Sequence, residues 1–160
     1  MTQPAEMKDA VRTSIVVPAT PEHAFTVFTE QFGAWWPRDY SIGKVDMADF
    51  IVEPMAGGRW YEVGVDGSEC DTGRVTAYVP PNRIVLAWHL NGTWQFDPDP
   101  DHASEVEVRF VSAGDGRTRV ELEHGHFERH GADAPLVRAA MDSAGGWGHC
   151  LAAYVARLAA

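Results

Sequence analysis

Three histidines near one strand end are the first candidates for chemistry. His124 and His126 are separated by one residue, and His130 follows four positions later. Imidazole nitrogens bind zinc, but protein zinc sites usually add cysteine or carboxylate ligands at defined spacing, and this run has none. We therefore favour structural histidines and expect no metal. His124 shares strand parity with the apolar Val120 and Leu122, so it is the imidazole best placed to donate a hydrogen bond to a ligand carbonyl.

Glu62 is the candidate acid or base. It lies two positions after Trp60 in a run typical of a strand, so both side chains point to the same face. If that face is buried, desolvation raises the pKa of the carboxylate, which can then act as a general acid or as a polar anchor for a ligand. A bulge or the opposite face would instead leave Glu62 in water, and the sequence favours this second interpretation.

The sequence lacks the motifs of several enzyme and cofactor classes. It contains no GxSxG elbow, no phosphate-binding GxxxxGKS or GxxxxGKT, no GxGxxG and no HExxH. Cys70 and Cys150 lack CxxC spacing and fit a reducing compartment better than a disulfide scaffold. Cys150 follows His149, but adjacent helix residues point about 100° apart and do not form a nucleophile–base pair. We expect no cofactor.

The elements that must position these groups begin with a strand and a helix. Residues 11–17 are rich in β-branched side chains and end at Pro18. Thr20 is a good N-cap for a helix that carries an apolar phenylalanine stripe and is expected to end at Gly33. From about 49 to 123, short strand-like runs separated by turn signals predict about six further strands in antiparallel hairpins.

The last element is a long helix predicted over residues 134–158. Its apolar positions recur every three or four residues, as a core-facing stripe requires. Gly145, Gly146 and Gly148 lie in the middle, and each costs up to about 1 kcal/mol relative to alanine. Either the helix breaks there, or the missing side chains let the sheet approach or leave a void beneath Trp147. A twisted antiparallel sheet covering this helix makes an α+β domain, with a cavity expected between the two.

Length and charge limit the partners. The chain has 160 residues, enough for a single domain, which we place at 11–160 after a flexible tail over 1–10. With 13 Lys plus Arg against 23 Asp plus Glu, the net charge is −10, and no basic patch for nucleic acid is present. No apolar run approaches the 20 or so residues of a membrane span, so no membrane insertion is expected. The N-terminus also lacks a secretory signal, which favours a cytoplasmic location.

An ordered set of motifs resembles a known superfamily. The motifs are EPMAGGRW (53–60), DGSE (66–69), GRV (73–75), PPNRIVL (80–86), Trp88, SEVEVRF (104–110), TRVELEH (118–124), FERHG (127–131) and Gly146–Trp147. They resemble the SRPBCC (START-like) superfamily, and within it the bacterial single-domain proteins similar to the C-terminal domain of the activator of heat-shock protein 90 ATPase. The resemblance implies the helix-grip fold, in which about seven antiparallel strands wrap around a long C-terminal helix above a mostly apolar cavity. Members bind lipids, sterols or polyketides, and some are cyclases or aromatases, but they share no catalytic residue.

Aromatic side chains supply most of the expected ligand site. Trp147, Met141 and Leu151 share the helix face that would form the cavity wall, and Trp35 with Trp36 precedes Pro37 where the fold places a lid. The complete set of predicted ligand-binding residues is Trp35, Trp36, Trp60, Glu62, Trp88, His124, Met141, Trp147 and Leu151.

Three functions follow from these expectations. The leading one is binding of a small, largely apolar molecule without chemistry. The alternative is a cyclase, aromatase or hydrolase in which Glu62 and His124 act on one enclosed substrate. The second alternative is an ATPase activator acting on a chaperone, which we rank last because 160 residues leave no room for the separate N-terminal domain of the activator proteins. The sequence leaves a homodimer open.

Overall fold

A computed structural model describes residues 9–159 of the chain. The tail predicted over residues 1–10 falls almost entirely outside the described residues, so the tail and the domain limits stay predictions. No helix in the described part is long and apolar enough to cross a membrane.

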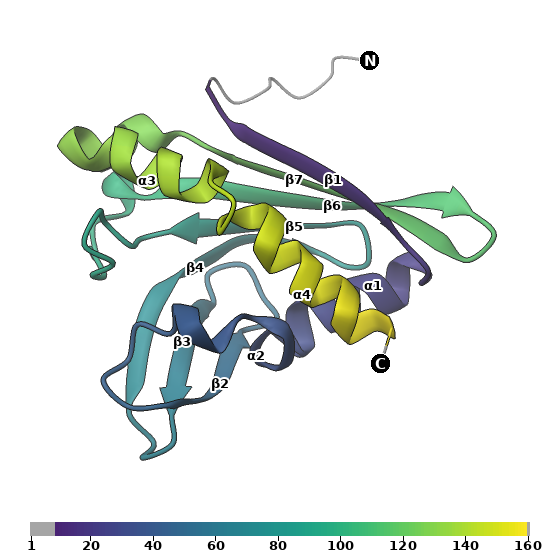
Figure 1. Ribbon diagram of the computed structural model, residues 1–160, viewed down its shortest axis with the longest axis horizontal. Helices are drawn as coiled ribbons and strands as arrows, with labels where there is room; N and C mark the ends of the chain where they lie inside the picture. The colour runs from purple at the N-terminus through teal and green to yellow at the C-terminus, as the bar shows by residue number, and fades with distance from the viewer. Residues whose placement is uncertain (1–8, 160) are drawn as a thin grey trace.

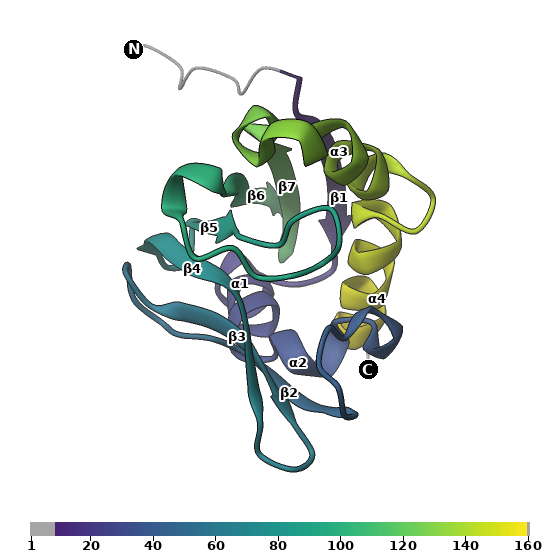
Figure 2. The same ribbon diagram turned by 90° about the vertical axis from the view of Figure 1, so that its left-hand side faces the viewer.

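The strands form one antiparallel sheet of seven strands in the order β1-β7-β6-β5-β4-β3-β2 (Figure 1). They are β1 (Val11–Val17), β2 (Met47–Val52), β3 (Arg59–Gly64), β4 (Glu69–Val79), β5 (Arg83–Trp88), β6 (Ser104–Gly114) and β7 (Arg117–Gly125). The helical segments are α1 (Pro21–Glu30), α2 (Phe32–Trp35), η1 (Arg38–Tyr40), η2 (Pro100–His102), η3 (Phe127–Asp133), α3 (Ala134–Asp142) and α4 (Trp147–Ala159). Helices α2, α3 and α4 lie on one side of the curved sheet (Figure 2). The predicted α+β helix-grip fold is confirmed.

Helix α1 forms as the sequence predicts and anchors the core. The Thr20 hydroxyl caps it by accepting a hydrogen bond from the backbone N–H of His23 at 3.2 Å. Phe28, on its buried face, makes edge contacts with Phe110 of β6 at 5.6 Å and with Tyr154 of α4 at 5.4 Å between ring centroids. The apolar stripe of α1 therefore joins the sheet to the C-terminal helix.

One predicted helix end is wrong, and a helix break that the sequence left open is present. Gly33 does not end the first helix but lies inside α2, where a Cβ atom would stand 2.4 Å from the backbone N of Phe50. The glycine is needed because α2 packs directly on β2. The helix predicted over 134–158 is also two helices, since α3 ends at Asp142 and α4 starts at Trp147. The glycines that the sequence singled out lie at and just after this break.

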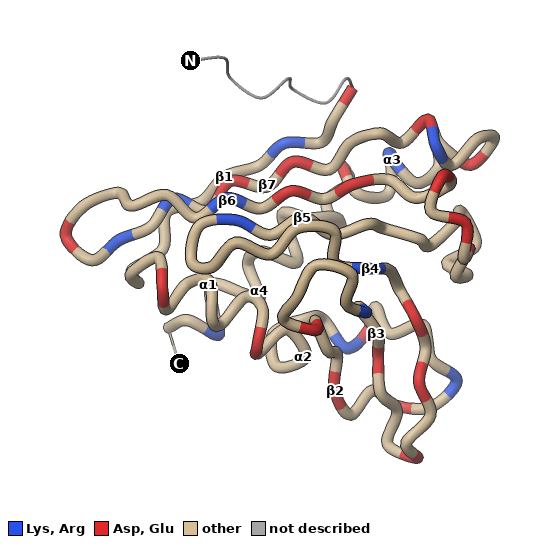
Figure 3. The backbone as a smooth tube through the Cα atoms, turned by 180° about the vertical axis from the view of Figure 1, so that it is seen from behind, with Lys and Arg blue, Asp and Glu red and all other residues tan. Residues whose placement is uncertain are grey.

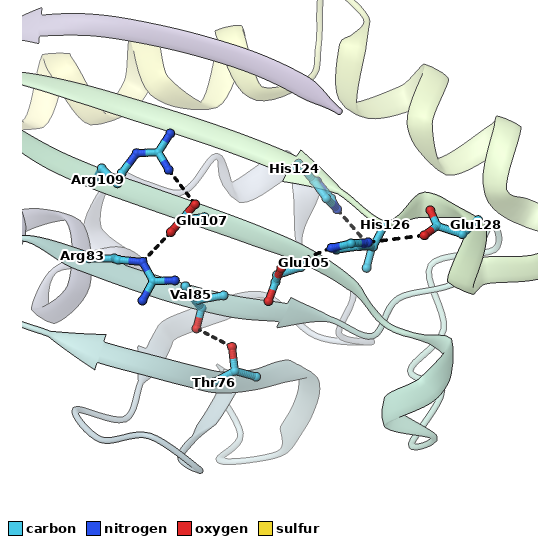
Figure 4. A network of polar contacts seen from close by, with 10 residues as sticks. Thr76, Arg83, Val85, Glu105, Glu107, Arg109, His124, His126 and Glu128 are labelled. Carbon is cyan, nitrogen blue, oxygen red and sulfur yellow. Dashed lines mark hydrogen bonds and ion pairs between the residues drawn. The ribbon is translucent and has the colours of Figure 1, made fainter. Parts of the chain in front are cut away.

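The outer face of the sheet carries charges of both signs. Arg and Glu residues both occur along β6 and β7 when the molecule is seen from behind (Figure 3). Arg83 and Arg109 face each other across β5 and β6, and Glu107 forms an ion pair with each of them (Figure 4). Such exposed pairs stabilise the fold only slightly and mark a solvated surface. The buried apolar side chains of β6 and β7, such as Val108 and Val120, lie on the other face.

Candidate functional site

A cavity of about 550 Å³ lies between the sheet and the junction of α3 with α4. Four neighbouring strands each contribute one inward side chain to it: Phe50 of β2, Glu62 of β3, Thr72 of β4 and Trp88 of β5. Met141, Gly146, Trp147 and Cys150 form the opposite wall, and Trp36, Tyr40 and Trp94 lie toward the loops that surround it. This volume is in the usual range for small-molecule sites.

The break between α3 and α4 shapes the cavity wall. A Cβ atom on Gly146 would stand 2.0 Å from the backbone oxygen of Met141, so only glycine permits this close turn. Tyr40 approaches the same turn and donates a hydrogen bond from its hydroxyl to the backbone oxygen of Gly145 at 2.6 Å. Both alternatives that the sequence left open are therefore present: the glycines break the helix, and the break opens onto the cavity.

Glu62 is the buried carboxylate of this wall, whereas Asp39, which also lines the cavity, is exposed. The side chain of Glu62 is buried, and its two carboxylate oxygens accept hydrogen bonds from the Ser41 hydroxyl at 2.6 Å and from the backbone N–H of Ile42 at 2.9 Å. The favoured interpretation that left Glu62 in water is wrong, because the register shift between Trp60 and Tyr61 does not turn Glu62 outward. Each carboxylate oxygen keeps a lone pair, so Glu62 can accept a further hydrogen bond from a ligand.

Three buried polar groups in the cavity wall have no partner among the described residues. They are the indole N–H groups of Trp36 and Trp88 and the hydroxyl of Thr72. An unpaired buried donor costs about 1 to 3 kcal/mol, so such groups are uncommon in folded proteins. The cavity wall therefore combines aromatic surface with buried polar groups that have no partner among the described residues.

His124 lies behind the cavity wall and not in it. Its Nδ1 accepts a hydrogen bond from the Trp147 indole N–H at 3.0 Å, and its Nε2 lies 2.8 Å from the Ser104 hydroxyl. Burial lowers the pKa of His124 well below its usual value, so the ring is neutral. The structure therefore places His124 outside the cavity lining, with both of its ring nitrogens in hydrogen-bond contact with protein groups.

The neighbouring histidines hold no metal site. His126 is turned to the outer face, where it pairs with Glu128 at 3.3 Å and Glu105 at 3.7 Å (Figure 4). Within residues 9–159, no group of three His, Cys, Asp or Glu side chains is arranged to hold a metal ion.

Of the other predicted ligand-binding residues, some line the cavity and some are core. Trp36, Trp88, Met141 and Trp147 line it, as Glu62 does. Trp35 is buried and donates its indole N–H to the backbone oxygen of Phe28 at 3.2 Å. Trp60 is fully buried beneath Phe50, and Leu151 is buried in the core cluster. These three residues therefore pack behind the cavity wall. Strand parity and helix spacing predict that their side chains are buried, but these patterns do not distinguish residues that line a cavity from residues of the solid core.

Trp94 is a site residue that the sequence reasoning missed. It follows the Asn91–Gly92 turn with a positive φ of 61°, and its half-exposed ring meets the ring of Trp88 at 6.4 Å between centroids. A bulky residue in the left-handed region is strained, and such strain concentrates at functional sites. The sequence signal for this site residue is a tryptophan two positions after the Asn91–Gly92 turn motif.

Two substitutions of Trp94 distinguish the effect of backbone strain on stability from the effect of losing the indole ring. Trp94→Gly and Trp94→Ala both remove the indole, but only glycine adopts a positive φ without cost, so we expect Trp94→Gly to be about 1 kcal/mol more stable than Trp94→Ala. Urea unfolding followed by circular dichroism measures the difference. Equal stability of the two variants would show that the native backbone conformation is not strained.

Cys150 also lines the cavity, but it is not a nucleophile. Burial raises the pKa of its thiol to about 12, so the thiol is protonated at neutral pH. The reactive form of cysteine is the thiolate, and Cys150 therefore contributes apolar surface to the wall.

Comparison with known proteins agrees with the fold. The chain is 42% identical to a protein described as an anthrahydroquino-gamma-pyrone synthase, Txn09, complexed with SUM, over 96% of this chain and 99% of that one, with a TM-score of 0.66. It is 35% identical to CalC, a self-sacrificing resistance protein from Micromonospora echinospora, over 93% of both chains, with a TM-score of 0.69. A protein from Nitrosomonas europaea shares the fold at 15% identity, covering 99% of this chain and 98% of that one, with a TM-score of 0.64. No protein of curated function matches the sequence.

The family assignment follows from the extent of these matches. The family described as Activator of Hsp90 ATPase homolog 1-like protein matches residues 18–159, which include every strand except β1 and both walls of the cavity. The resemblance of the sequence motifs to the SRPBCC superfamily is thereby confirmed. The chain belongs to the Activator of Hsp90 ATPase homolog 1-like family, within the SRPBCC superfamily.

Proposed function

We propose that this protein binds a planar, oxygenated aromatic molecule of polyketide type in the cavity between the sheet and the α3–α4 junction. The observation that carries this proposal is the composition of the wall, where Trp36, Trp88 and Trp147 surround a space of about 550 Å³. Their rings contact one another edge to face, with Trp147 at 5.8 Å from Trp36 and at 6.1 Å from Trp88 between centroids. Flat aromatic walls favour a flat aromatic ligand, which can stack on one ring and meet the edge of another.

The polar groups of the cavity indicate which polar groups the aromatic ligand carries. The unpaired indole N–H groups of Trp36 and Trp88 are donors only, so they require acceptor oxygens such as quinone or ketone carbonyls. Glu62 is an acceptor that matches a phenolic hydroxyl. The 42% identity to a synthase of an anthrahydroquinone-type pyrone supports a ligand of this class.

Catalysis by Glu62 alone is the second candidate. A buried carboxylate that faces an apolar cavity can remove a proton from a phenol or from carbon next to a carbonyl, a step that many ring closures require. The form of the enzyme hypothesis that paired Glu62 with His124 loses its geometric basis, because His124 lies behind Trp147. The relative described as a synthase supports the Glu62 version.

Fluorescence quenching with matched probes tests the proposal. We expect 1,8-dihydroxyanthraquinone to bind at least about tenfold more tightly than anthracene, which has the same three fused rings without oxygens, because one or two hydrogen bonds are worth about that much. Palmitate, a lipid probe, should bind more weakly still. Equal affinity for anthracene, or tighter binding of palmitate, would contradict the proposed ligand class.

A pair of variants then localises the binding. Glu62→Gln should weaken the binding of 1,8-dihydroxyanthraquinone by about tenfold and leave the affinity for anthracene unchanged, since the amide loses the charge-assisted acceptor. The matched control is Glu121→Gln, whose side chain lies on the outer face of β7 near Arg109. Equal effects of both substitutions would place the probe outside the cavity.

A further inference from the structure

A buried chain of hydrogen bonds leads from the cavity wall to the half-buried His130. The Trp147 indole N–H lies 3.0 Å from His124 Nδ1, His124 Nε2 lies 2.8 Å from the Ser104 hydroxyl oxygen, and that oxygen lies 2.7 Å from His130 Nε2. Trp147, His124 and Ser104 are almost completely buried, and His130 is partly exposed. The chain joins α4 to β7, β6 and η3, three elements that follow one another along the sequence.

The directions of the bonds in this chain follow from its first member together with the burial of the others. An indole N–H only donates, so His124 Nδ1 must be the acceptor and carries no proton. His124 is neutral, and its proton is therefore on Nε2, which donates to the oxygen of Ser104. The Ser104 O–H is then free to donate to His130 Nε2, and since an unpaired O–H would be costly at this fully buried position, we infer that His130 Nε2 carries no proton. All bonds run from the cavity toward His130.

Charged groups from each neighbouring segment act on His130. Asp133 of η3 and Asp97, which precedes η2, favour its charged form, whereas His89 and His102 oppose it. Burial is the largest effect and lowers the pKa of His130 below its usual value near 6.5. The ring is therefore neutral at pH 7.5 and takes up a proton in the folded protein only under acidic conditions.

We propose that His130, Ser104 and His124 are positioning residues that hold the Trp147 ring in the cavity wall, and that proton uptake by His130 loosens this hold. When Nε2 of His130 gains a proton, the Ser104 O–H loses its acceptor inside the core. It must either remain unpaired or turn toward His124 Nε2. His124 can accept it only by moving its own proton to Nδ1, which breaks the bond from Trp147. Either outcome weakens the chain that fixes the indole.

The indole N–H resonance of Trp147 reports this directly in the ligand-free protein. The six tryptophans give six such resonances, and loss of one in Trp147→Phe assigns it. Between pH 7.5 and 5.0 we expect the Trp147 resonance to shift in the wild-type protein but stay fixed in His130→Gln, whose amide oxygen can accept from Ser104 but cannot titrate. Ser104→Ala should show the shifted resonance already at pH 7.5. Circular dichroism confirms at each pH that the chain is folded.

Two results would overturn the inference. One is a Trp147 resonance that stays constant in the folded wild-type protein across this range, and the other is an equal shift in His130→Gln. A purely structural role for His130 predicts one of these, because it links no titration to the indole.

The consequence for binding rests on the proposed function. We expect the dissociation constant of 1,8-dihydroxyanthraquinone to rise about tenfold from pH 7.5 to 5.0 in the wild-type protein and to change less than twofold in His130→Gln. Parallel weakening of both proteins would count against the coupling. If the probe binds neither protein at pH 7.5, the proposed function fails, and the resonance of Trp147 alone decides this inference.

Discussion

Trp147→Ala is expected to lower the free energy of unfolding by about 3 to 5 kcal/mol and to abolish probe binding. The side chain is 1% exposed, and its removal leaves a large cavity and a buried His124 Nδ1 without its donor. Because natural domains are stable by only about 5 to 15 kcal/mol, such a loss is readily visible in urea unfolding. The variant therefore tests whether Trp147 is both part of the core and part of the site.

Trp147→Phe is the matched control for this variant. It keeps an aromatic ring in the wall but removes the N–H that bonds to His124, so we expect a smaller loss of about 1 to 3 kcal/mol and weakened, not abolished, binding. A Trp147→Ala variant within 1 kcal/mol of the wild type would show that the ring is not embedded as described.

The second large effect is that alanine substitutions at two nearby glycines should change the free energy of unfolding in opposite directions. Gly146→Ala should destabilise the protein by about 1 to 3 kcal/mol, since its Cβ would meet the backbone of Met141 at 2.0 Å. Gly148→Ala should stabilise it by about 0.5 to 1 kcal/mol, because nothing lies within 4 Å of that Cβ and alanine is the better helix former in α4.

Thermal and urea unfolding of the two glycine variants measures both values. Destabilisation by Gly148→Ala, or a neutral Gly146→Ala, would contradict the account in which the break before α4 is sterically required and the first turn of α4 is not.

The sequence carried enough information for the fold because local signals agreed with one another. The Thr20 cap and the alternating strands all led to elements at the expected places. The C-terminal helix was predicted as one element because the spacing of its apolar residues continues across the break. The separation of α3 from α4 is visible only in three dimensions. Gly146 lies so close to the backbone of Met141 that a Cβ atom on it would stand 2.0 Å from the Met141 oxygen.

The site was harder to predict because burial and cavity lining give the same sequence pattern. Trp60 and Glu62 share a strand face, yet Glu62 lines the cavity and Trp60 does not. Likewise Trp147 and Leu151 share a helix face, but only Trp147 reaches the cavity. His124 was placed correctly on the inner face, but its partner is Trp147, a residue of another element that no local pattern connects to it.

A crystal structure of the complex with 1,8-dihydroxyanthraquinone tests the central claim most directly. We expect the three fused rings to lie in the cavity against Trp36, Trp88 and Trp147, with a ligand hydroxyl within hydrogen-bond distance of the Glu62 carboxylate and a ligand oxygen at the indole N–H of Trp36 or Trp88. A probe bound on the outer face of the sheet, or at the cavity without contact to these three rings, would contradict it.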